Sequence, residues 1–252
     1  LGSINKKKFV KRSGAKDGDI LVVSGDLGGS YMGLQVLERE KSVFEVNPNS
    51  QPDLSEYTYC IQRQLKPEAR KDIVKALDDM DILPTSMIDI SDGLSTEINH
   101  LSSSSDLSIH IYEDKIPIAE ETKKVCDEFG INPTVAALNG GEDYELLFTI
   151  SKKNSKKIAD NPLFRILGSC TKKKNDNCMI TSIGQKINIS SDGWDPFNKW
   201  LFYPRATSRH IIIINPPINP KVAISVYLSN WVSGITSSTT TKIIAPAAKA
   251  KA

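Results

Sequence analysis

The chain has 252 residues, of which 39% are hydrophobic and 25% charged, a composition typical of one large or two small globular domains. Its apolar runs are too short for a membrane span and no signal-peptide pattern is visible, so we expect a cytoplasmic protein without a membrane partner. Charge is divided unevenly. Residues 1–200 hold all 30 acidic residues and 26 of the 32 basic ones, a net charge of −4, whereas residues 201–252 hold no acid.

Short β-branched runs, amphipathic stretches and turn residues predict the elements. In chain order they are strand 20–25, helices 30–40, 57–64 and 67–80, strand 85–90, helix 93–105 with Asp92 as its N-cap, strand 107–118, helix 120–129, strand 144–150, helix 151–160, and strands 164–170 and 178–184, which we expect to pair. Strands and helices mix without the strict alternation and glycine fingerprint of a dinucleotide fold, which favours the α+β class.

The acid-free stretch 201–252 carries thinly spread cations and lacks an amphipathic helical pattern. We therefore predict an appended, weakly structured tail and no nucleic-acid partner. The alternative is a true extension of the domain, because "AISVYLSNWV" has the composition of a strand. The four cysteines are scattered and fit no familiar zinc motif, so we interpret them as reduced thiols.

The stretch "SMIDISDGL" places two acids where a strand turns into a helix. Alternation along a strand puts Asp89 and Ser91 on one face, and Asp92 follows at the strand's end. One interpretation is structural, with Asp92 capping the helix and Asp89 facing solvent. The other is a site for a hard cation, because Mg²⁺ takes one or two carboxylates and keeps several waters.

Two further glycine-containing stretches are candidates for function. In "LNGGEDYELLF", paired glycines allow a close backbone approach just before Glu142 and Asp143. In "GDLGGS", a loop precedes a helix, whose first N–H groups can bind phosphate. Each has an ordinary alternative, a solvated turn in the first stretch and a common loop in the second.

Taken in order, "RSGAKDGD", "VSGDLGGSYMGL", "SMIDISDGL" and "NGGEDYELLFT" resemble the carboxy-terminal half of the thiamine-monophosphate kinase family, within the PurM-like ATP-binding superfamily. The resemblance implies an α+β fold, a mixed or antiparallel sheet packed with helices. It divides the chain into a linker (1–19), a PurM-like carboxy-terminal domain (20–200) and a non-family tail (201–252). It also implies transfer of the γ-phosphoryl group of ATP onto thiamine monophosphate, with ATP and magnesium as cofactors.

The resemblance also implies roles for individual residues. Arg12 and Ser91 would contact ATP, Asp89 and Asp92 would bind magnesium, and Glu142 and Trp194 would contact thiamine monophosphate. Trp194 has a structural alternative, in which it covers an edge of the core. No catalytic side chain is implied, because the acceptor is a phosphate that is already ionised near neutral pH.

The family's amino-terminal half has no counterpart in this chain. The chain alone is therefore expected to be inactive, and the parent enzyme to be a homodimer formed through the missing half. Two alternatives stay open: another ATP-using synthetase of the superfamily, of the aminoimidazole-ribonucleotide or selenophosphate type, or a non-catalytic nucleotide-binding fragment.

Overall fold

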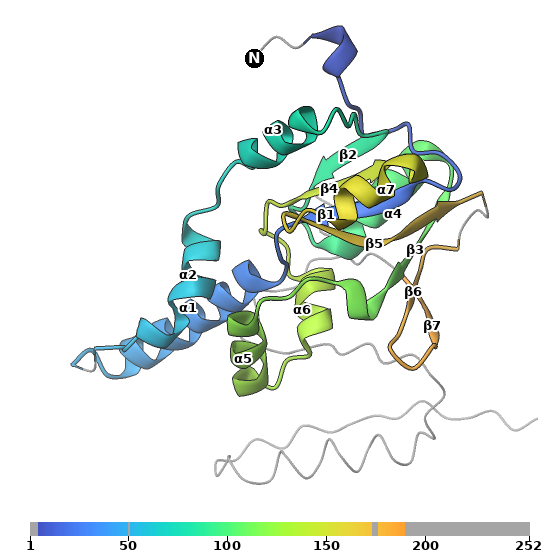
Figure 1. Ribbon diagram of the computed structural model, residues 1–252. Helices are drawn as coiled ribbons and strands as arrows, with labels where there is room; N and C mark the ends of the chain where they lie inside the picture. Colours follow the sequence, from blue (N-terminus) through green and yellow to red (C-terminus); the bar gives the residue numbers. More distant parts are fainter. Residues whose placement is uncertain (1–4, 50, 173–175, 190–252) are drawn as a thin grey trace, which may run out of the picture. The chain divides into compact units, whose positions relative to one another are not determined.

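The structure is a computed structural model that describes residues 5–49, 51–172 and 176–189 (Figure 1). One seven-stranded sheet, in the order β2-β4-β1-β5-β3-β6-β7, organises this part of the chain. Its strands are β1 (Ile20–Ser24), β2 (Ser86–Asp89), β3 (Ser108–Tyr112), β4 (Leu146–Ile150), β5 (Phe164–Thr171), β6 (Cys178–Ile180) and β7 (Lys186–Asn188). The pairings are antiparallel except for that of β3 with β6, so the predicted mixed α+β fold is confirmed.

Helices connect the strands and cover the sheet. They are α1 (Gly29–Val46), α2 (Thr58–Leu65), α3 (Lys71–Asp79), α4 (Leu94–Ser105), α5 (Glu120–Phe129), α6 (Pro133–Asn139) and α7 (Ser155–Ala159). Four 3₁₀ turns complete the described elements: η1 (Lys6–Lys8), η2 (Ser55–Tyr57), η3 (Glu113–Lys115) and η4 (Lys152–Asn154). None of the helices in the described ranges is long and apolar enough to cross a membrane.

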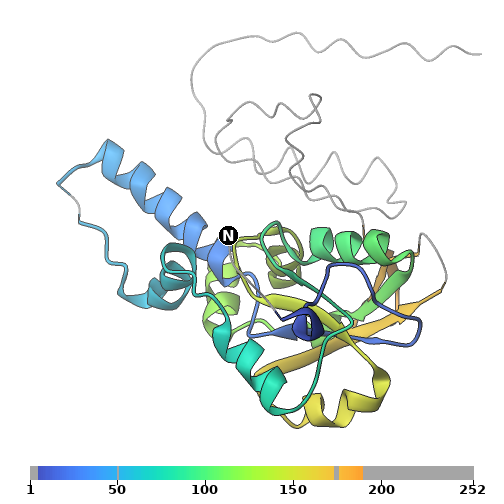
Figure 2. The same ribbon diagram turned by 90° about the horizontal axis from the view of Figure 1, so that it is seen from above.

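Strand β1 is buried on both faces of the sheet, which explains its continuous apolar sequence. Because side chains alternate along a strand, Leu21 and Val23 join a core cluster with α4, whereas Ile20 and Val22 join a second cluster with α3 and α7. Figure 2 shows α4 on one side of the sheet and α3 and α7 on the other. The sheet is thus the middle layer of three.

A third apolar cluster joins α1, α2, α5 and α6 beside the sheet layers. Met32 and Val36 of α1 pack there with Cys60 of α2 and Cys126 of α5. Gly33 allows the close packing of α1 on α2, because a Cβ at this position would lie 2.1 Å from the Cys60 carbonyl oxygen. All four cysteines are thiols outside any disulfide, as the scattered spacing predicted, and all four are buried.

Three expectations about elements are wrong. The strands near 164–170 and 178–184 do not pair with each other, because β3 lies between them and bonds to both. The helix expected over 67–80 begins only at Lys71, after an N-cap at Arg70. The helix after β2 has Gly93, not Asp92, as its N-cap. Trp194 and the tail 201–252 lie outside the described residues.

Candidate functional site

The two acidic motifs lie side by side at one edge of the sheet. Asp89 at the end of β2 is opposite Leu146 at the start of β4. The pairing continues past both strands: the backbone N–H of Tyr144 donates to the Ile90 carbonyl at 2.8 Å, and that of Glu142 donates to the Ser91 carbonyl at 2.8 Å. Stretches more than fifty residues apart in the chain thus form one continuous ladder.

Glycines make this close approach possible. A Cβ at Gly141 would lie 2.6 Å from the carbonyl oxygen of Ser91, and one at Gly93 would lie 2.6 Å from the carbonyl oxygen of Leu138. Both glycines also have positive φ, 70° and 109°, which other residues rarely adopt. The glycine pair before Glu142 was expected to let the backbone approach a ligand closely; in the described structure Gly141 instead lets this loop approach the backbone of the turn after β2.

The acidic side chains at this edge point away from the core. The predicted alternation is confirmed, since Ile88 and Ile90 are buried and Asp89 is exposed. Asp92 and Glu142 are also exposed. The Tyr144 hydroxyl donates to Glu142 Oε2 at 3.0 Å; this hydrogen bond, followed by the negative charges of Glu142, Asp89 and Asp92, raises the pKa of Tyr144. The negative charges of three carboxylates therefore act on the Tyr144 phenol.

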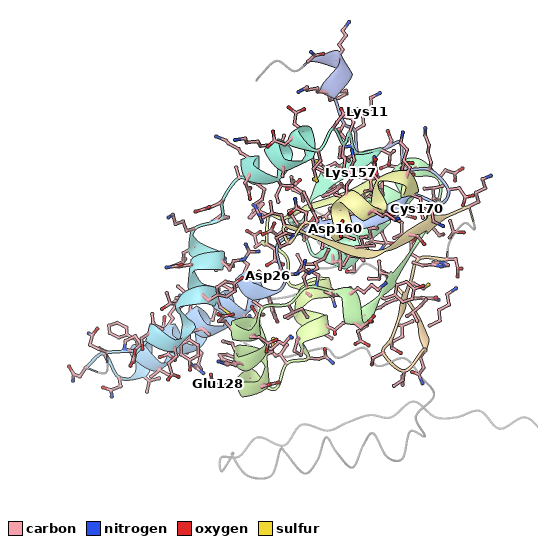
Figure 3. The ribbon with its side chains drawn as sticks, in the orientation of Figure 1. Lys11, Asp26, Glu128, Lys157, Asp160 and Cys170 are labelled. Atoms are coloured by element: carbon pink, nitrogen blue, oxygen red, sulfur yellow. The ribbon has the colours of Figure 1, made fainter. Side chains whose placement is uncertain are left out.

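Arg12 lies along the free edge of β2. The neighbouring Lys11, labelled in Figure 3, accepts a 3.0 Å hydrogen bond at its carbonyl from the Met87 N–H. Gly14 is equally close to β2, because a Cβ there would lie 2.5 Å from the Thr85 carbonyl oxygen. Arg12 is exposed, and among the residues of known placement it forms no ion pair. A cation without a partner therefore lies along the same strand as Asp89.

A buried carboxylate, Glu97 of α4, holds the turn between β2 and α4. Its Oε1 accepts from the backbone N–H of Asp92 at 3.2 Å and from the Ser91 hydroxyl at 3.3 Å. Burial raises the pKa of this side chain, which is 1% exposed. The sequence prediction missed Glu97. Its signal was an acid in the first turn of a helix, where a side chain can reach back to free N–H groups.

The amide groups before α1 are already occupied by a protein carboxylate. Asp143 accepts hydrogen bonds from the backbone N–H groups of Gly28 at 2.8 Å and Ser30 at 3.3 Å. Burial raises the pKa of Asp143 to about 6, while these bonds and the nearby Arg63 oppose that rise. The "GDLGGS" loop thus binds the loop of the second motif through the donors that would otherwise suit a phosphate.

Glu145 anchors the same loop through a buried ionic network. It is 1% exposed, accepts from the Ser24 hydroxyl at 2.5 Å and from Arg63 at 3.0 Å, and also forms an ion pair with Arg70. In the described part of the chain, two buried side-chain atoms lack a hydrogen-bond partner, and they are Arg63 Nε and Asp26 Oδ1. Asp26 lies at the junction of β1 and α1 (Figure 3). The sequence prediction assigned no function to these residues.

The residues that alternate with these anchors, the exposed Glu142 and the half-buried Tyr144, have strained backbones. Glu142 has φ 61° and Tyr144 has φ 52°, left-handed values that cost an L-residue about 1–2 kcal/mol each. Strain of this kind persists only where the surrounding structure imposes it. The buried Asp143 and Glu145 supply that constraint here.

The donor set fits an incompletely enclosed Mg²⁺ site. Across residues 5–49, 51–172 and 176–189, no three His, Cys, Asp or Glu side chains gather as a metal cage. Asp89 and Asp92 provide two exposed carboxylates, which suits an ion that completes its shell with water and substrate phosphates. Trp194, the sixth predicted site residue, lies outside the described residues.

Comparison with known families connects this edge of the sheet to a known domain. Residues 16–177 match the family described as "AIR synthase related protein, C-terminal domain". The chain belongs to this family. The matched segment contains four of the six predicted site residues, Asp89, Ser91, Asp92 and Glu142, and Arg12 lies four residues before it.

Curated relatives extend the match to named enzymes. The chain is 42% identical over 147 residues to the thiamine-monophosphate kinase of Aquifex aeolicus, covering 58% of this chain and 44% of that protein. It is 31% identical over 204 residues to the thiamine-monophosphate kinase of Escherichia coli K12, covering 78% and 58%. The predicted resemblance to this kinase family is confirmed. The chain spans about half the length of the curated relatives it matches.

Solved structures show the same similarity in three dimensions. The structure of AaThiL complexed with AMPPCP and TMP matches with a TM-score of 0.61 and 35% identity, over 75% of this chain and 55% of that chain. The hydrogenase maturation protein HypE of Escherichia coli matches with a TM-score of 0.55 at 18% identity, over 78% and 56%. At that identity the second likeness concerns the fold alone.

Proposed function

We propose that this chain is the carboxy-terminal part of an enzyme that phosphorylates thiamine monophosphate to thiamine diphosphate at the expense of ATP. The observation that supports this most is the sheet edge where Asp89, Asp92 and Glu142 lie together with the exposed cation of Arg12 along β2. Curated relatives are named thiamine-monophosphate kinase, and a similar chain was solved with AMPPCP and TMP.

We assign each predicted site residue one part in this reaction. Arg12 and Ser91 bind the phosphates of ATP, the first by charge and the second through its hydroxyl. Asp89 and Asp92 hold magnesium, which when bound supplies positive charge that offsets the repulsion between two phosphate-bearing reactants. Glu142 binds thiamine monophosphate through hydrogen bonds or charge, and Trp194 contacts its ring system. The chain needs no general base, because the acceptor phosphate is already ionised.

The remaining assignments follow from the same proposal. Because this chain spans about half the length of its relatives, we expect it to be inactive alone. We further infer a cytoplasmic enzyme that forms a homodimer through an amino-terminal half.

The proposal is tested with a full-length enzyme. The amino-terminal half of the Aquifex aeolicus relative is joined before Phe9 to give what we call the two-domain enzyme. ADP release is then measured with thiamine monophosphate, ATP and magnesium, beside the 252-residue chain alone. We expect turnover only in the two-domain enzyme. Asp89→Asn and Asp92→Asn should each lower it by about 100-fold or more, because each removes a charge that holds the ion.

The controls separate the alternatives. Both variants should melt like the unmodified chain, because both side chains are exposed and the N-cap of α4 is Gly93. Near-unmodified turnover of either variant at saturating magnesium contradicts the metal role. Turnover with an aminoimidazole-ribonucleotide precursor or selenide, and none with thiamine monophosphate, selects a synthetase. Nucleotide binding without turnover on any acceptor selects the non-catalytic alternative.

A further inference from the structure

The strained backbone near the site falls on two unusual residue types. Four non-glycine residues in the described ranges have left-handed φ, namely Asp81, Asp106, Glu142 and Tyr144. Aspartate tolerates this conformation better than most residues, and Asp106 is the left-handed C-cap of α4. Glu142 and Tyr144 have no such local reason. Backbone outliers of this kind are common where a side chain must be presented in a defined direction.

The strain is imposed by the residues on either side. Asp143 and Glu145 are 4% and 1% exposed, and both are bound to other elements by the hydrogen bonds and ion pairs given above. The N–H groups of Glu142 and Tyr144 donate to carbonyls in the turn after β2. Every residue from 142 to 145 therefore bonds to a neighbouring element, which fixes the directions of the exposed Glu142 and the half-buried Tyr144.

These two side chains are joined to each other. The Tyr144 hydroxyl donates to Oε2 of Glu142 at 3.0 Å, whereas Oε1 has no hydrogen-bond partner among the described residues. A solvent-exposed glutamate ordinarily samples many rotamers, and a ligand that binds it must fix one. The phenol fixes the carboxylate in advance and leaves its second oxygen available to a ligand. The charges of Asp89 and Asp92 act on the same phenol.

We propose that Tyr144 is a positioning residue for substrate binding, whose hydroxyl orients the Glu142 carboxylate toward an amine-bearing or cationic group of the substrate. This inference rests on the proposed function, in which the substrate has an aromatic amine and a permanently cationic ring. It adds a residue that supports the Glu142 contact with the substrate and assigns a purpose to the strained loop. Tyr144 acts through Glu142 and takes no part in phosphoryl transfer itself.

The experiment measures the kinetics of Tyr144→Phe in the two-domain enzyme. The variant removes one hydroxyl and keeps the ring and its packing. We expect KM for thiamine monophosphate to rise about 3- to 10-fold, the ratio that corresponds to one net hydrogen bond, with KM for ATP and kcat within twofold. In a Glu142→Ala background the same change should have less than a twofold effect, because the side chain that the phenol orients is gone. Tyr112→Phe is the matched control, since it removes an exposed phenol hydroxyl on β3, away from β2 and β4.

The outcomes distinguish this inference from the proposed function. If the unmodified enzyme turns over thiamine monophosphate but Tyr144→Phe leaves its KM within twofold, this inference alone is wrong. Equal rises in both KM values, or the same effect in the Glu142→Ala background, assign Tyr144 to packing and also overturn it. If the unmodified enzyme neither binds thiamine monophosphate in a calorimeter nor turns it over, both proposals fail together.

Discussion

Among single residues, Glu97 shows how a buried carboxylate can support an exposed site. It binds the Ser91 hydroxyl and the Asp92 N–H, so it orders two neighbours that are proposed to contact ATP and magnesium. When a buried donor loses its acceptor, the protein loses the full desolvation free energy of that donor, which exceeds the net stabilisation that the hydrogen bond gives. The Glu97 side chain is therefore expected to matter for both stability and nucleotide binding.

Glu97→Leu should destabilise the 252-residue chain by about 1–3 kcal/mol, because it leaves the Asp92 N–H and the Ser91 hydroxyl without their acceptor. Glu97→Gln should cost less, since its amide oxygen can accept the same bonds. Urea unfolding measures both. In the two-domain enzyme the leucine variant should also raise KM for ATP more than the glutamine variant. Equal stability of the two variants would show that Glu97 only fills space.

Among elements, the sequence predicted those whose signals are local. Three elements are marked by residues within their own stretch: β1 by its apolar run, α1 by its amphipathic pattern and α5 by Gly130 at its end. Each appears at or near its predicted place. The missed helix α6 also had a local signal, because the Asn132 side chain caps it ahead of Pro133 at its first position. The order of the strands had no local signal. The position of β3 between β5 and β6 depends on packing between segments that are distant in the chain.

The stability of the fold should depend on pH through Asp143, the buried acid that binds the N–H groups at the start of α1. Burial raises the pKa of Asp143 to about 6, above the usual value of about 3.9, so the folded state binds this proton more tightly than the unfolded state. The ionised form therefore lowers stability above pH 6, and this penalty is lost as the pH falls toward about 4.

The measurement is the difference in unfolding free energy between the unmodified chain and Asp143→Asn across this range. The unmodified chain should gain up to about 3 kcal/mol relative to the variant between pH 7 and about pH 4, because the asparagine cannot titrate. Other acids cancel in the difference, including Asp72, whose pKa is lowered by its hydrogen bond with Arg70. A flat difference would mean that Asp143 keeps an ordinary pKa, held down by the Gly28 and Ser30 N–H groups and Arg63.

At the scale of the whole molecule, the site arises from contacts that no single stretch encodes. Local patterns predicted that Asp89 is exposed beside a buried strand, and the resemblance implied that Glu142 acts with it. That the two lie on one ladder follows from the pairing of β2 with β4, which joins residues nearly sixty positions apart. The anchors of Glu145 on Arg63 and Arg70 follow from the packing of α2 and α3, and neither arginine has a local motif.

The limits of the folded unit can be tested by truncation. The described core residues run from Ala15 to Met179, with Ile189 packed against them, so a chain ending at Trp200 keeps every one of them. We expect this chain to have the same thermal midpoint and urea midpoint as the full 252 residues, within the error of the measurements. A chain ending at Asn177 is the control. It lacks the buried Cys178 and Met179 of β6, and loss of two core side chains should cost about 3–6 kcal/mol, which the assay must detect. A loss of several kcal/mol on truncation at Trp200 would contradict the prediction and support the alternative, in which "AISVYLSNWV" adds a strand to the sheet.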